Sequence, residues 1–191
     1  MGGVVAYEIA RRLEKEGCQV RLLALLDAPF AMPRDRALDE DTLAAQFLDD
    51  ATLSLGTDSQ SRPDPANTPA AGQLAWLATH LLQTTSPNAD LSADSGDLAA
   101  LAVQLGQRFD VFRAHWQMIG GYEPEPSPAV QAPTLIVSAN DSPNAPTRDL
   151  WPKVLAGPVT TLPVDGDHYT FLRPPTVAKI AISIKQASES T

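Results

Sequence analysis

The chain has 191 residues, of which 43% are hydrophobic and 19% charged, and this is the composition of an ordinary globular protein. A net charge of −9 disfavours non-specific nucleic-acid binding, because phosphate contact needs clustered Lys and Arg and the 14 basic residues form no extended run. The single cysteine, Cys18, excludes an internal disulfide framework. No apolar run approaches the about 20 residues that a membrane span needs. We therefore expect a cytoplasmic protein without nucleic-acid or membrane partners.

The first segment predicts a helix, because apolar side chains recur at helical spacing at Val5, Ile9 and Leu13. Gly17 stands where the C′ residue of this helix would lie. Met1-Gly2 match the last two positions of the nucleophile-elbow motif G-x-S-x-G, in which a strained turn between a strand and a helix carries a serine. On this interpretation Gly3 removes a Cβ atom where the helix crosses a strand.

The serine of this motif would directly precede Met1. None of the serines between Ser54 and Ser190 lies in a G-x-S-x-G sequence. In a complete elbow the backbone N–H of Met1 would be the first oxyanion-hole donor. We therefore expect a domain truncated at its N-terminus, which either begins at an internal Met of a longer gene or survives as a shortened reading frame.

Residues Val20 to Leu26 form a nearly continuous apolar run, which is typical of a parallel strand buried on both faces. The run ends at Asp27. Open α/β sheets bind their ligands at the carboxyl ends of the strands, so Asp27 is a candidate functional carboxylate. The alternative is that Asp27 only caps the turn at Ala28-Pro29.

From about Pro33 to Gly120 the pattern changes to helices joined by polar loops. The helices are expected at Asp41–Leu53, Gly72–Gln83 and Ala93–Ile119. A helical insertion between two strands of an α/β sheet is typical of a lid over an active site, and the alternative is a helical addition without this role. We expect His80 and His115 to pack within this segment, because neither has a carboxylate at a spacing that would orient it.

Strand character returns at Pro133–Ala139 and Val159–Val164, and a last helix follows around Val177 to Ile184. The loop between the last strand and this helix carries His168. An imidazole at this edge can accept a serine proton and return it to a leaving group, provided that a carboxylate holds its other ring nitrogen. By itself His168 could equally be an exposed loop residue.

Four segments together resemble, in order and spacing, the thioesterase domains that end non-ribosomal peptide synthetase and polyketide synthase lines: GGVVAYEIARRLEKEGCQV, RLLALLDAPF, FRAHWQMIGGYEPEP and GDHYTFLRPPTVAKIA. The resemblance covers nearly all of residues 1–30 and 108–185 and is loose over 31–107. It implies an α/β-hydrolase fold with a mostly parallel sheet, truncated at the N-terminus, in which residues 1–191 form one domain with a helical lid at about 33–120. It also implies release of an acyl or peptidyl chain from the phosphopantetheine of a carrier protein, by hydrolysis or cyclisation.

The resemblance implies a Ser-His-Asp triad in which His168 is the general base and Asp27 the acid. Asp141 is the rival acid, because many α/β-hydrolases carry the acid after this later strand and the chain order Ser, acid, His holds for both. Asp167 is interpreted as a neighbour that shapes the loop. The resemblance implies no metal and no cofactor.

In the α/β-hydrolase strand order, the three strands expected here are neighbours, and Leu22–Leu26 lies at the edge of the sheet. Without its serine the 191-residue chain is expected to be inactive. Two alternatives stay open: a non-catalytic remnant that binds acyl groups or a carrier protein, and an esterase or lipase of the same fold. The identity of the acyl chain and the choice between hydrolysis and cyclisation stay open as well.

Overall fold

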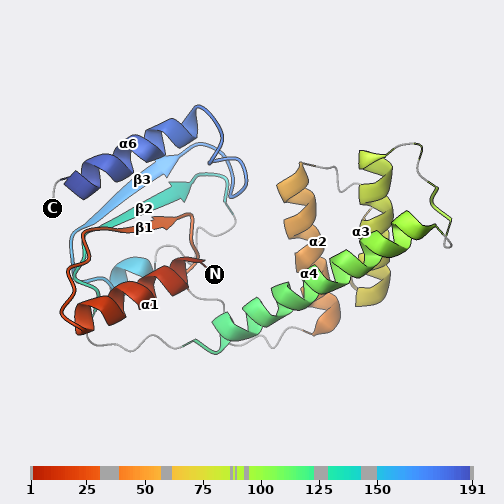
Figure 1. Cartoon of the computed structure of the whole chain (residues 1–191), viewed down its shortest axis with the longest axis horizontal. Coiled ribbons are helices and arrows are strands. Elements are labelled where there is room, and N and C mark those ends of the chain that lie inside the picture. Colours follow the sequence, from red (N-terminus) through yellow and green to blue (C-terminus); the bar gives the residue numbers. More distant parts are fainter. Residues whose placement is uncertain are drawn as a thin grey trace. The chain divides into compact units, whose positions relative to one another are not determined.

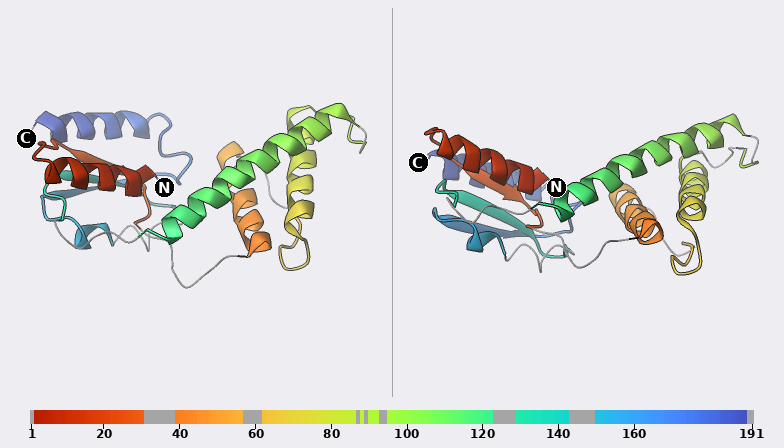
Figure 2. Two further views of the ribbon diagram at one scale, coloured as in Figure 1. Left: turned by 60° about the horizontal axis from the view of Figure 1, so that its bottom comes forward. Right: turned by 90° about the horizontal axis from the view of Figure 1, so that it is seen from below.

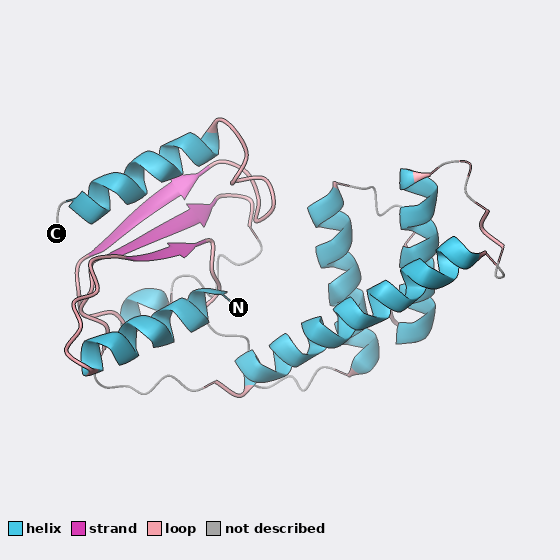
Figure 3. Ribbon diagram, viewed as in Figure 1, coloured by secondary structure: helices cyan, strands magenta, loops and turns pink. Residues whose placement is uncertain are grey.

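The computed structural model describes residues 2–30, 39–56, 62–86, 88, 90–92, 95–122, 129–142 and 150–189. The chain divides into two compact units (Figure 1). The sheet unit comprises Met1–Pro33 and Ile119–Thr191, and the helical unit comprises Arg34–Met118. Figure 3 shows that the strands belong to the first unit and that the second is built from helices. The helical unit coincides with the expected insertion, and its role as a lid stays a prediction.

The sheet unit is built on three parallel strands, β1 (Leu23–Leu26), β2 (Thr134–Ala139) and β3 (Val159–Val164), in the order β1-β2-β3. Thr134 of β2 pairs with Leu23 on one side and with Val159 on the other. The expected strands, their order and the edge position of β1 within the described sheet are confirmed. Because the strands are parallel, their carboxyl ends meet at one edge, and the loops that follow them lie close together.

Helices cover both faces of this sheet, with α1 (Gly2–Lys15) on one side and α6 (Thr176–Glu189) on the other (Figures 1 and 2). Side chains of a strand alternate between its two faces. Those that pack with α1 are Leu23, Leu25 and Ile136. Those in the cluster that includes Ile180 of α6 are Leu135, Val137 and Ala139. The continuous apolar runs are therefore explained by burial on both faces.

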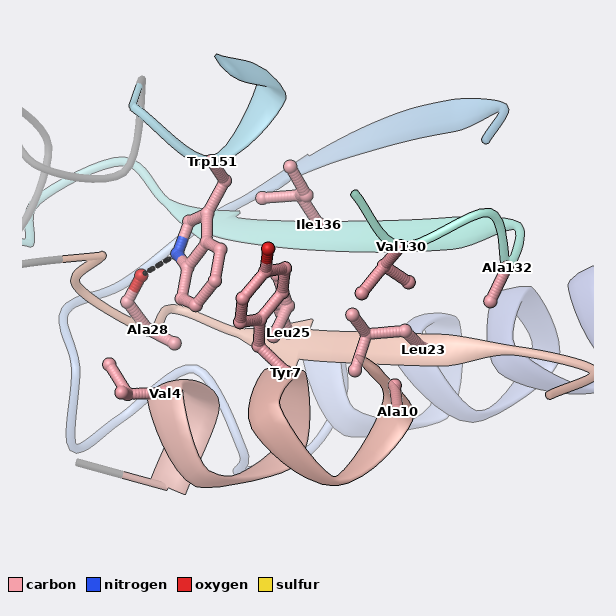
Figure 4. Close-up of a cluster of buried hydrophobic side chains, with 10 residues drawn as sticks. All are labelled: Val4, Tyr7, Ala10, Leu23, Leu25, Ala28, Val130, Ala132, Ile136 and Trp151. Atoms are coloured by element: carbon pink, nitrogen blue, oxygen red, sulfur yellow. Dashed lines mark hydrogen bonds between the residues drawn. The ribbon is translucent and has the colours of Figure 1, made fainter. Parts of the chain in front are cut away.

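The core between α1 and the sheet is centred on Trp151, which lies in the short 3₁₀ helix η1 (Trp151–Lys153) (Figure 4). The indole Nε1 of Trp151 donates to the carbonyl oxygen of Ala28 at 2.7 Å, and the ring of Tyr7 packs against it at a centroid distance of 5.6 Å. A Cβ atom at Gly3 would lie 2.4 Å from the Cβ of Ala28. The prediction that Gly3 permits the close crossing of helix and strand is confirmed.

Helix α1 ends at Lys15, and Gly17, the expected C′ residue, follows in the left-handed conformation with φ of 81°. The N–H of Gly17 donates to the carbonyl oxygen of Glu14 at 2.9 Å. The carboxylate of Glu14 also accepts the backbone N–H groups of Gln131 and Ala132, at 2.8 and 2.7 Å. The last turn of α1 is thereby fixed to the segment that leads into β2.

The apolar residues at helical spacing on α1 do not face the sheet. Val5, Ile9 and Leu13 are 48%, 53% and 39% exposed. The buried side chains are those of Val4, Tyr7, Ala10 and Arg11. Arg11 is buried in spite of its charge because its guanidinium binds both carboxylate oxygens of Glu8, each at 2.9 Å. The spacing therefore predicted the helix correctly, but the face that packs against the sheet is the one that carries Val4, Tyr7 and Arg11.

The helical unit contains α2 (Glu40–Leu55), α3 (Ala70–Thr85) and most of α4 (Gly96–Gly120), each within three residues of its expected bounds. It has a core of its own, in which Phe47 of α2 packs against Phe109 and Phe112 of α4 at centroid distances of 5.6 and 5.5 Å. Asp39 caps α2 by accepting the N–H of Thr42 at 2.7 Å. Across the described ranges, no helix is long and apolar enough to span a bilayer.

Candidate active site

Asp27 directly follows β1, and its side chain is fully buried. Its φ of 45° lies in the left-handed region, which Asp and Asn tolerate better than most other residues. The backbone N–H of Asp27 still donates to the carbonyl oxygen of Val137 at 2.8 Å, so pairing with β2 continues up to the turn. The sharp turn leaves the carboxylate against the carboxyl end of β2.

Three hydrogen-bond donors among the described residues hold this carboxylate. The N–H of Ala139 donates to Oδ1 at 3.0 Å, the hydroxyl of Ser142 donates to Oδ2 at 2.5 Å, and Nδ1 of His168 lies 2.9 Å from Oδ2. A buried carboxylate is destabilising unless its oxygens are hydrogen-bonded or paired with a charge. These contacts stabilise Asp27 at the edge of the sheet where the strands end.

His168 lies in the loop after β3, and its side chain is 37% exposed. An ionised carboxylate can only accept hydrogen bonds, so with Asp27 ionised Nδ1 of His168 is the donor, and a neutral ring then carries its lone pair on Nε2. The ring of Tyr169 packs edge-on against the imidazole at a centroid distance of 5.3 Å. The imidazole is thus oriented through the contact of Nδ1 with Asp27.

The loop around His168 is shaped by Asp167. Its Oδ1 atom accepts the N–H groups of Tyr169 and Thr170, at 2.8 and 2.9 Å, and the hydroxyl of Thr170 at 3.0 Å. The hydrogen bond from the N–H of Tyr169, more than any other contact, lowers the pKa of Asp167 below its ordinary value. Gly166, with φ of 100°, closes the turn before it. The interpretation of Asp167 as a loop-shaping residue is confirmed.

Asp141, the rival acid, is exposed in the turn after β2. Its backbone N–H donates to the carbonyl oxygen of Gly166 at 3.0 Å, so it supports the His168 loop through the main chain. Asp27 is the carboxylate on Nδ1 of His168. Of the two candidate acids, the structure thus brings Asp27 onto the ring of His168, and the catalytic role of either residue stays a prediction.

Ser142 is the residue of this site that sequence reasoning missed. Its side chain is buried, and its backbone N–H donates to the carbonyl oxygen of Ala139 at 3.3 Å, which folds the turn back toward Asp27. The sequence feature that could have indicated Ser142 is its position just after β2, at the edge where α/β sheets bind their ligands. Met1, the expected oxyanion donor, lies outside the described residues.

The remaining candidates, His80 and Cys18, are described by their own surroundings. His80 stacks on Trp76 within α3, at a centroid distance of 4.7 Å and an interplanar angle of 11°, so its expected packing role is confirmed. Cys18 is exposed in the turn after α1. Among the residues that the structure describes, no three His, Cys, Asp or Glu side chains gather as a metal site would require.

Comparison with known proteins gives one family match and several structural likenesses. A family model described as "Thioesterase domain" matches residues 1–184. The structure of holo-AB3403, a four-domain non-ribosomal peptide synthetase bound to AMP and glycine, is similar with a TM-score of 0.65 and 24% identity, over 97% of this chain and 14% of that chain.

Two thioesterase structures are similar over a larger share of their own length. The Vlm2 thioesterase domain bound with a dodecadepsipeptide has a TM-score of 0.53 and 22% identity, over 97% of this chain and 62% of that chain. The type II thioesterase BorB from the borrelidin biosynthetic cluster has a TM-score of 0.53 and 18% identity, over 97% of this chain and 61% of that chain. The chain thus spans less than two thirds of these structures, and at these identities the likeness shows the fold alone. No curated protein matches the chain.

Proposed function

Because the chain belongs to the thioesterase domain family, we propose that the protein hydrolyses or cyclises an acyl or peptidyl thioester borne on the phosphopantetheine of a carrier protein, in natural-product biosynthesis. The observation that carries this proposal is the contact of 2.9 Å between His168 Nδ1 and the buried Asp27, at the carboxyl edge of a parallel sheet. The likeness to thioesterases and a synthetase from natural-product pathways supports the substrate class.

In the first half of the proposed reaction, Nε2 of His168 accepts the proton of a serine hydroxyl while the serine oxygen attacks the thioester carbonyl carbon. Asp27 keeps the proton on Nδ1 and stabilises the imidazolium that forms. The imidazolium then donates its Nε2 proton to the departing phosphopantetheine sulfur as the C–S bond breaks. The acyl group remains as an ester on the serine, and Asp27 stays ionised throughout.

In the second half, a nucleophile attacks the carbonyl carbon of the serine ester. His168 accepts the proton of this nucleophile and then returns a proton to the serine oxygen as the ester bond breaks. When the nucleophile is water, the product is a free acid. When it is a hydroxyl or amine of the acyl chain itself, the product is a ring. The contact between Asp27 and His168 serves both outcomes equally.

Because Met1-Gly2 match the last two positions of G-x-S-x-G, we propose that a nucleophilic serine directly precedes Met1 in the active protein, with the backbone N–H of Met1 as the first oxyanion donor. The close approach of Gly3 to Ala28 supports this placement, because the residues after an elbow serine let the helix pack tightly on the sheet. The 191-residue sequence contains no G-x-S-x-G motif. The 191-residue chain alone is accordingly expected to lack thioesterase activity.

We further propose that the helical unit, Arg34–Met118, acts as a lid. It interrupts the chain between β1 and β2, two strands that end at the Asp27 and Ser142 side of the site, and it folds around its own core. A lid that closes over an acyl-enzyme excludes water, and the degree of closure would shift the balance between hydrolysis and cyclisation.

The proposal is tested with the full-length protein, expressed with the codons that precede Met1. We expect turnover of an acyl-N-acetylcysteamine thioester, with a lower rate on the matching simple ester. His168→Ala should reduce kcat by several orders of magnitude, because triad members act as a unit. Cys18→Ser, at an exposed position in the turn after α1, is the matched control and should retain wild-type turnover.

Three outcomes would contradict the proposal. Binding of the thioester without turnover would favour a non-catalytic acyl- or carrier-binding protein. Preference for the simple ester would favour an esterase or lipase of the same fold. Turnover by the 191-residue chain at about 1 s⁻¹, within the usual range for enzymes, would show that the nucleophile lies elsewhere.

A further inference from the structure

Among the described residues, two side chains hydrogen-bond to Oδ2 of Asp27, and one of them is His168. The other hydrogen bond comes from the hydroxyl of Ser142, at 2.5 Å, which is within the range of charge-assisted O–H···O⁻ bonds. We infer that Ser142 is a positioning residue that acts through Asp27 to lower the basicity of His168. This inference deepens the proposed function and rests on it for its kinetic consequence.

The turn after β2 places Ser142 for this role. The N–H of Ser142 donates to the carbonyl oxygen of Ala139, and the N–H of Ala139 donates to Oδ1 of Asp27. The same turn therefore supplies a donor to each carboxylate oxygen. With Oδ1 held by the backbone, the carboxylate keeps its orientation, and the Ser142 hydroxyl competes with Nδ1 of His168 for the charge on Oδ2.

The direction of the effect follows from this competition. A hydrogen bond to the ionised form of a carboxylate stabilises the negative charge. Asp27 with both donors attracts the imidazolium of His168 less strongly than it would without Ser142. Loss of the Ser142 hydroxyl therefore raises the pKa of His168, so that a larger fraction of the imidazole is protonated near neutral pH and cannot act as a base.

Among the described residues, several charged or aromatic groups near His168 stay the same in this comparison, including Arg173, whose charge acts on Asp167. Asp167 lies on its own loop and binds the amides of that loop. Asp141 lies in the turn after β2 and is exposed. Tyr169 contributes its ring edge. Because a substitution at Ser142 changes none of these groups, a shift of the His168 pKa reports the hydrogen bond to Asp27.

The experiment follows His168 in the full-length protein by NMR with ¹⁵N-labelled histidine, the resonance being assigned by its absence in His168→Ala. In Ser142→Ala we expect the pKa of His168 to rise by up to about one unit, since a hydrogen bond to a charged group is stronger than an ordinary one. Ser142→Thr keeps the hydroxyl and should restore the wild-type pKa. If Ser142→Ala does not fold, Ser142→Cys, which offers only a weak S–H donor, should give the same direction of shift.

The matched control is Thr134→Val, which removes a buried hydroxyl at the opposite end of β2, where it donates to the carbonyl oxygen of Ala132 at 3.1 Å. It should leave the His168 titration unchanged. An unchanged or lower pKa of His168 in Ser142→Ala, or an equal shift in Thr134→Val, would overturn the inference.

A kinetic measurement separates this inference from the proposed function. In Ser142→Ala the acidic limb of the kcat/KM profile for the acyl-N-acetylcysteamine thioester should move to higher pH by the same amount as the NMR titration, while the plateau at high pH changes little. Absence of thioester turnover in the wild-type protein would reject the proposed function, and the NMR titration would still decide the role of Ser142. An acidic limb that stays in place while the NMR pKa moves would overturn the catalytic consequence.

Discussion

At the scale of single residues, the site depends on Asp27, which combines two unfavourable conditions. Its charge is fully buried and its φ of 45° lies in the left-handed region. Each condition is destabilising by itself, and strained backbone of this kind is concentrated at functional sites. The three donors to its carboxylate offset the burial, and the turn directs the side chain toward them.

Replacement of Asp27 by Asn tests its assignment against Asp141. Asn keeps the size of the side chain and tolerates the left-handed conformation, but its amide does not enforce a proton on Nδ1 of His168. We expect Asp27→Asn to reduce kcat by about 10³–10⁴-fold in the full-length protein. Asp141→Asn alters only an exposed carboxylate and should leave kcat near the wild-type value. A greater loss of kcat in Asp141→Asn would transfer the role of acid to the later strand.

The residues at this scale differ in how far the sequence reveals them. Asp27 and His168 stand out as candidates in the sequence, because each lies in the segment after a strand and matches a thioesterase segment. Their contact needed the structure. Ser142 could not be predicted, because its hydroxyl reaches Asp27 only through the fold of the turn at Ala139, and Ser at such a position is common in ordinary turns.

At the scale of elements, the crossing of α1 over β1 depends on Gly3. In Gly3→Ala the new Cβ would lie 2.4 Å from the Cβ of Ala28 and 3.4 Å from the ring of Trp151, so the helix must move away from the sheet. We expect a loss of about 1–3 kcal/mol in the free energy of unfolding, as for other overpacked cores. Urea denaturation measures this loss.

Gly2→Ala is the matched control for this crossing, because a Cβ at Gly2 meets no described atom within 4 Å. It should change the free energy of unfolding by less than Gly3→Ala does. Equal losses of unfolding free energy in the two variants would show that the backbone freedom of glycine, and not the close approach to Ala28, explains the loss in Gly3→Ala.

Glu8 links α1 to the chain that follows α4. Its carboxylate binds Arg11 at 2.9 Å and Arg12 at 2.7 Å, and it accepts the hydroxyl of Tyr122 at 3.2 Å. The hydrogen bond from Arg11, assisted by those from Arg12 and Tyr122, lowers the pKa of Glu8 from 4.5 to about 2. Burial, followed by the charge of Glu8, raises the pKa of Tyr122. The folded state is thus stabilised when Glu8 is ionised.

The pH dependence of stability follows from this lowered pKa. The contribution of Glu8 is complete above pH 4.5, its value in the unfolded chain, and is lost as the pH falls toward about 2. We expect the difference in free energy of unfolding between wild type and Glu8→Gln to be largest above pH 4.5 and to shrink between pH 4.5 and about 2. Urea denaturation across this range measures it, and a difference independent of pH would contradict the pairing.

The helices and strands were largely predictable from the sequence, and their packed faces were less so. Strands β2 and β3 lie within a residue of their expected bounds, because their apolar runs end at turn residues. Helix α1 was predicted from Val5, Ile9 and Leu13, yet it buries Arg11 and Tyr7 instead. Polar groups that find partners inside a fold cannot be recognised by periodicity alone.

At the scale of the whole molecule, the 191-residue chain exposes two kinds of surface that promote association. Strand β1 has a neighbour on one side only in the described sheet, and its segment carries one charged residue, Arg21. The side chains of Val5, Ile9 and Leu13 form an exposed apolar stripe on α1. Unpaired edge strands and apolar patches both favour contacts with other chains.

We therefore expect the isolated 191-residue chain to be marginally stable or to aggregate. Ile9→Lys places a charge in the middle of the exposed stripe and should reduce light scattering without lowering the Tm of the soluble fraction. A monomeric wild-type chain with a sharp two-state melt above about 50 °C, typical of intact domains, would show that the described sheet is self-sufficient.

The division into two units could be predicted from the change of pattern near Pro33 and Gly120, because a purely helical stretch cannot supply strands to the sheet. The separate core of the helical unit could not be predicted residue by residue. Phe47 of α2 packs against Phe109 of α4, for example. Which helices pair in this way depends on the loops between them, whose course the sequence pattern does not predict.

The residues that flank the helical unit are fixed within the sheet unit, and this has a consequence for evolution. Phe30 packs edge-on against Trp151 at a centroid distance of 4.8 Å, and Tyr122 is held by Glu8. With its attachment points fixed, a segment that doubles in length adds only about 0.6 kcal/mol of closure entropy. Insertions and deletions between these two anchors can therefore accumulate while the contact of Asp27 with His168 is preserved. Under the proposed role of the helical unit as a lid, remodelling of this one segment of the gene would change the acyl specificity.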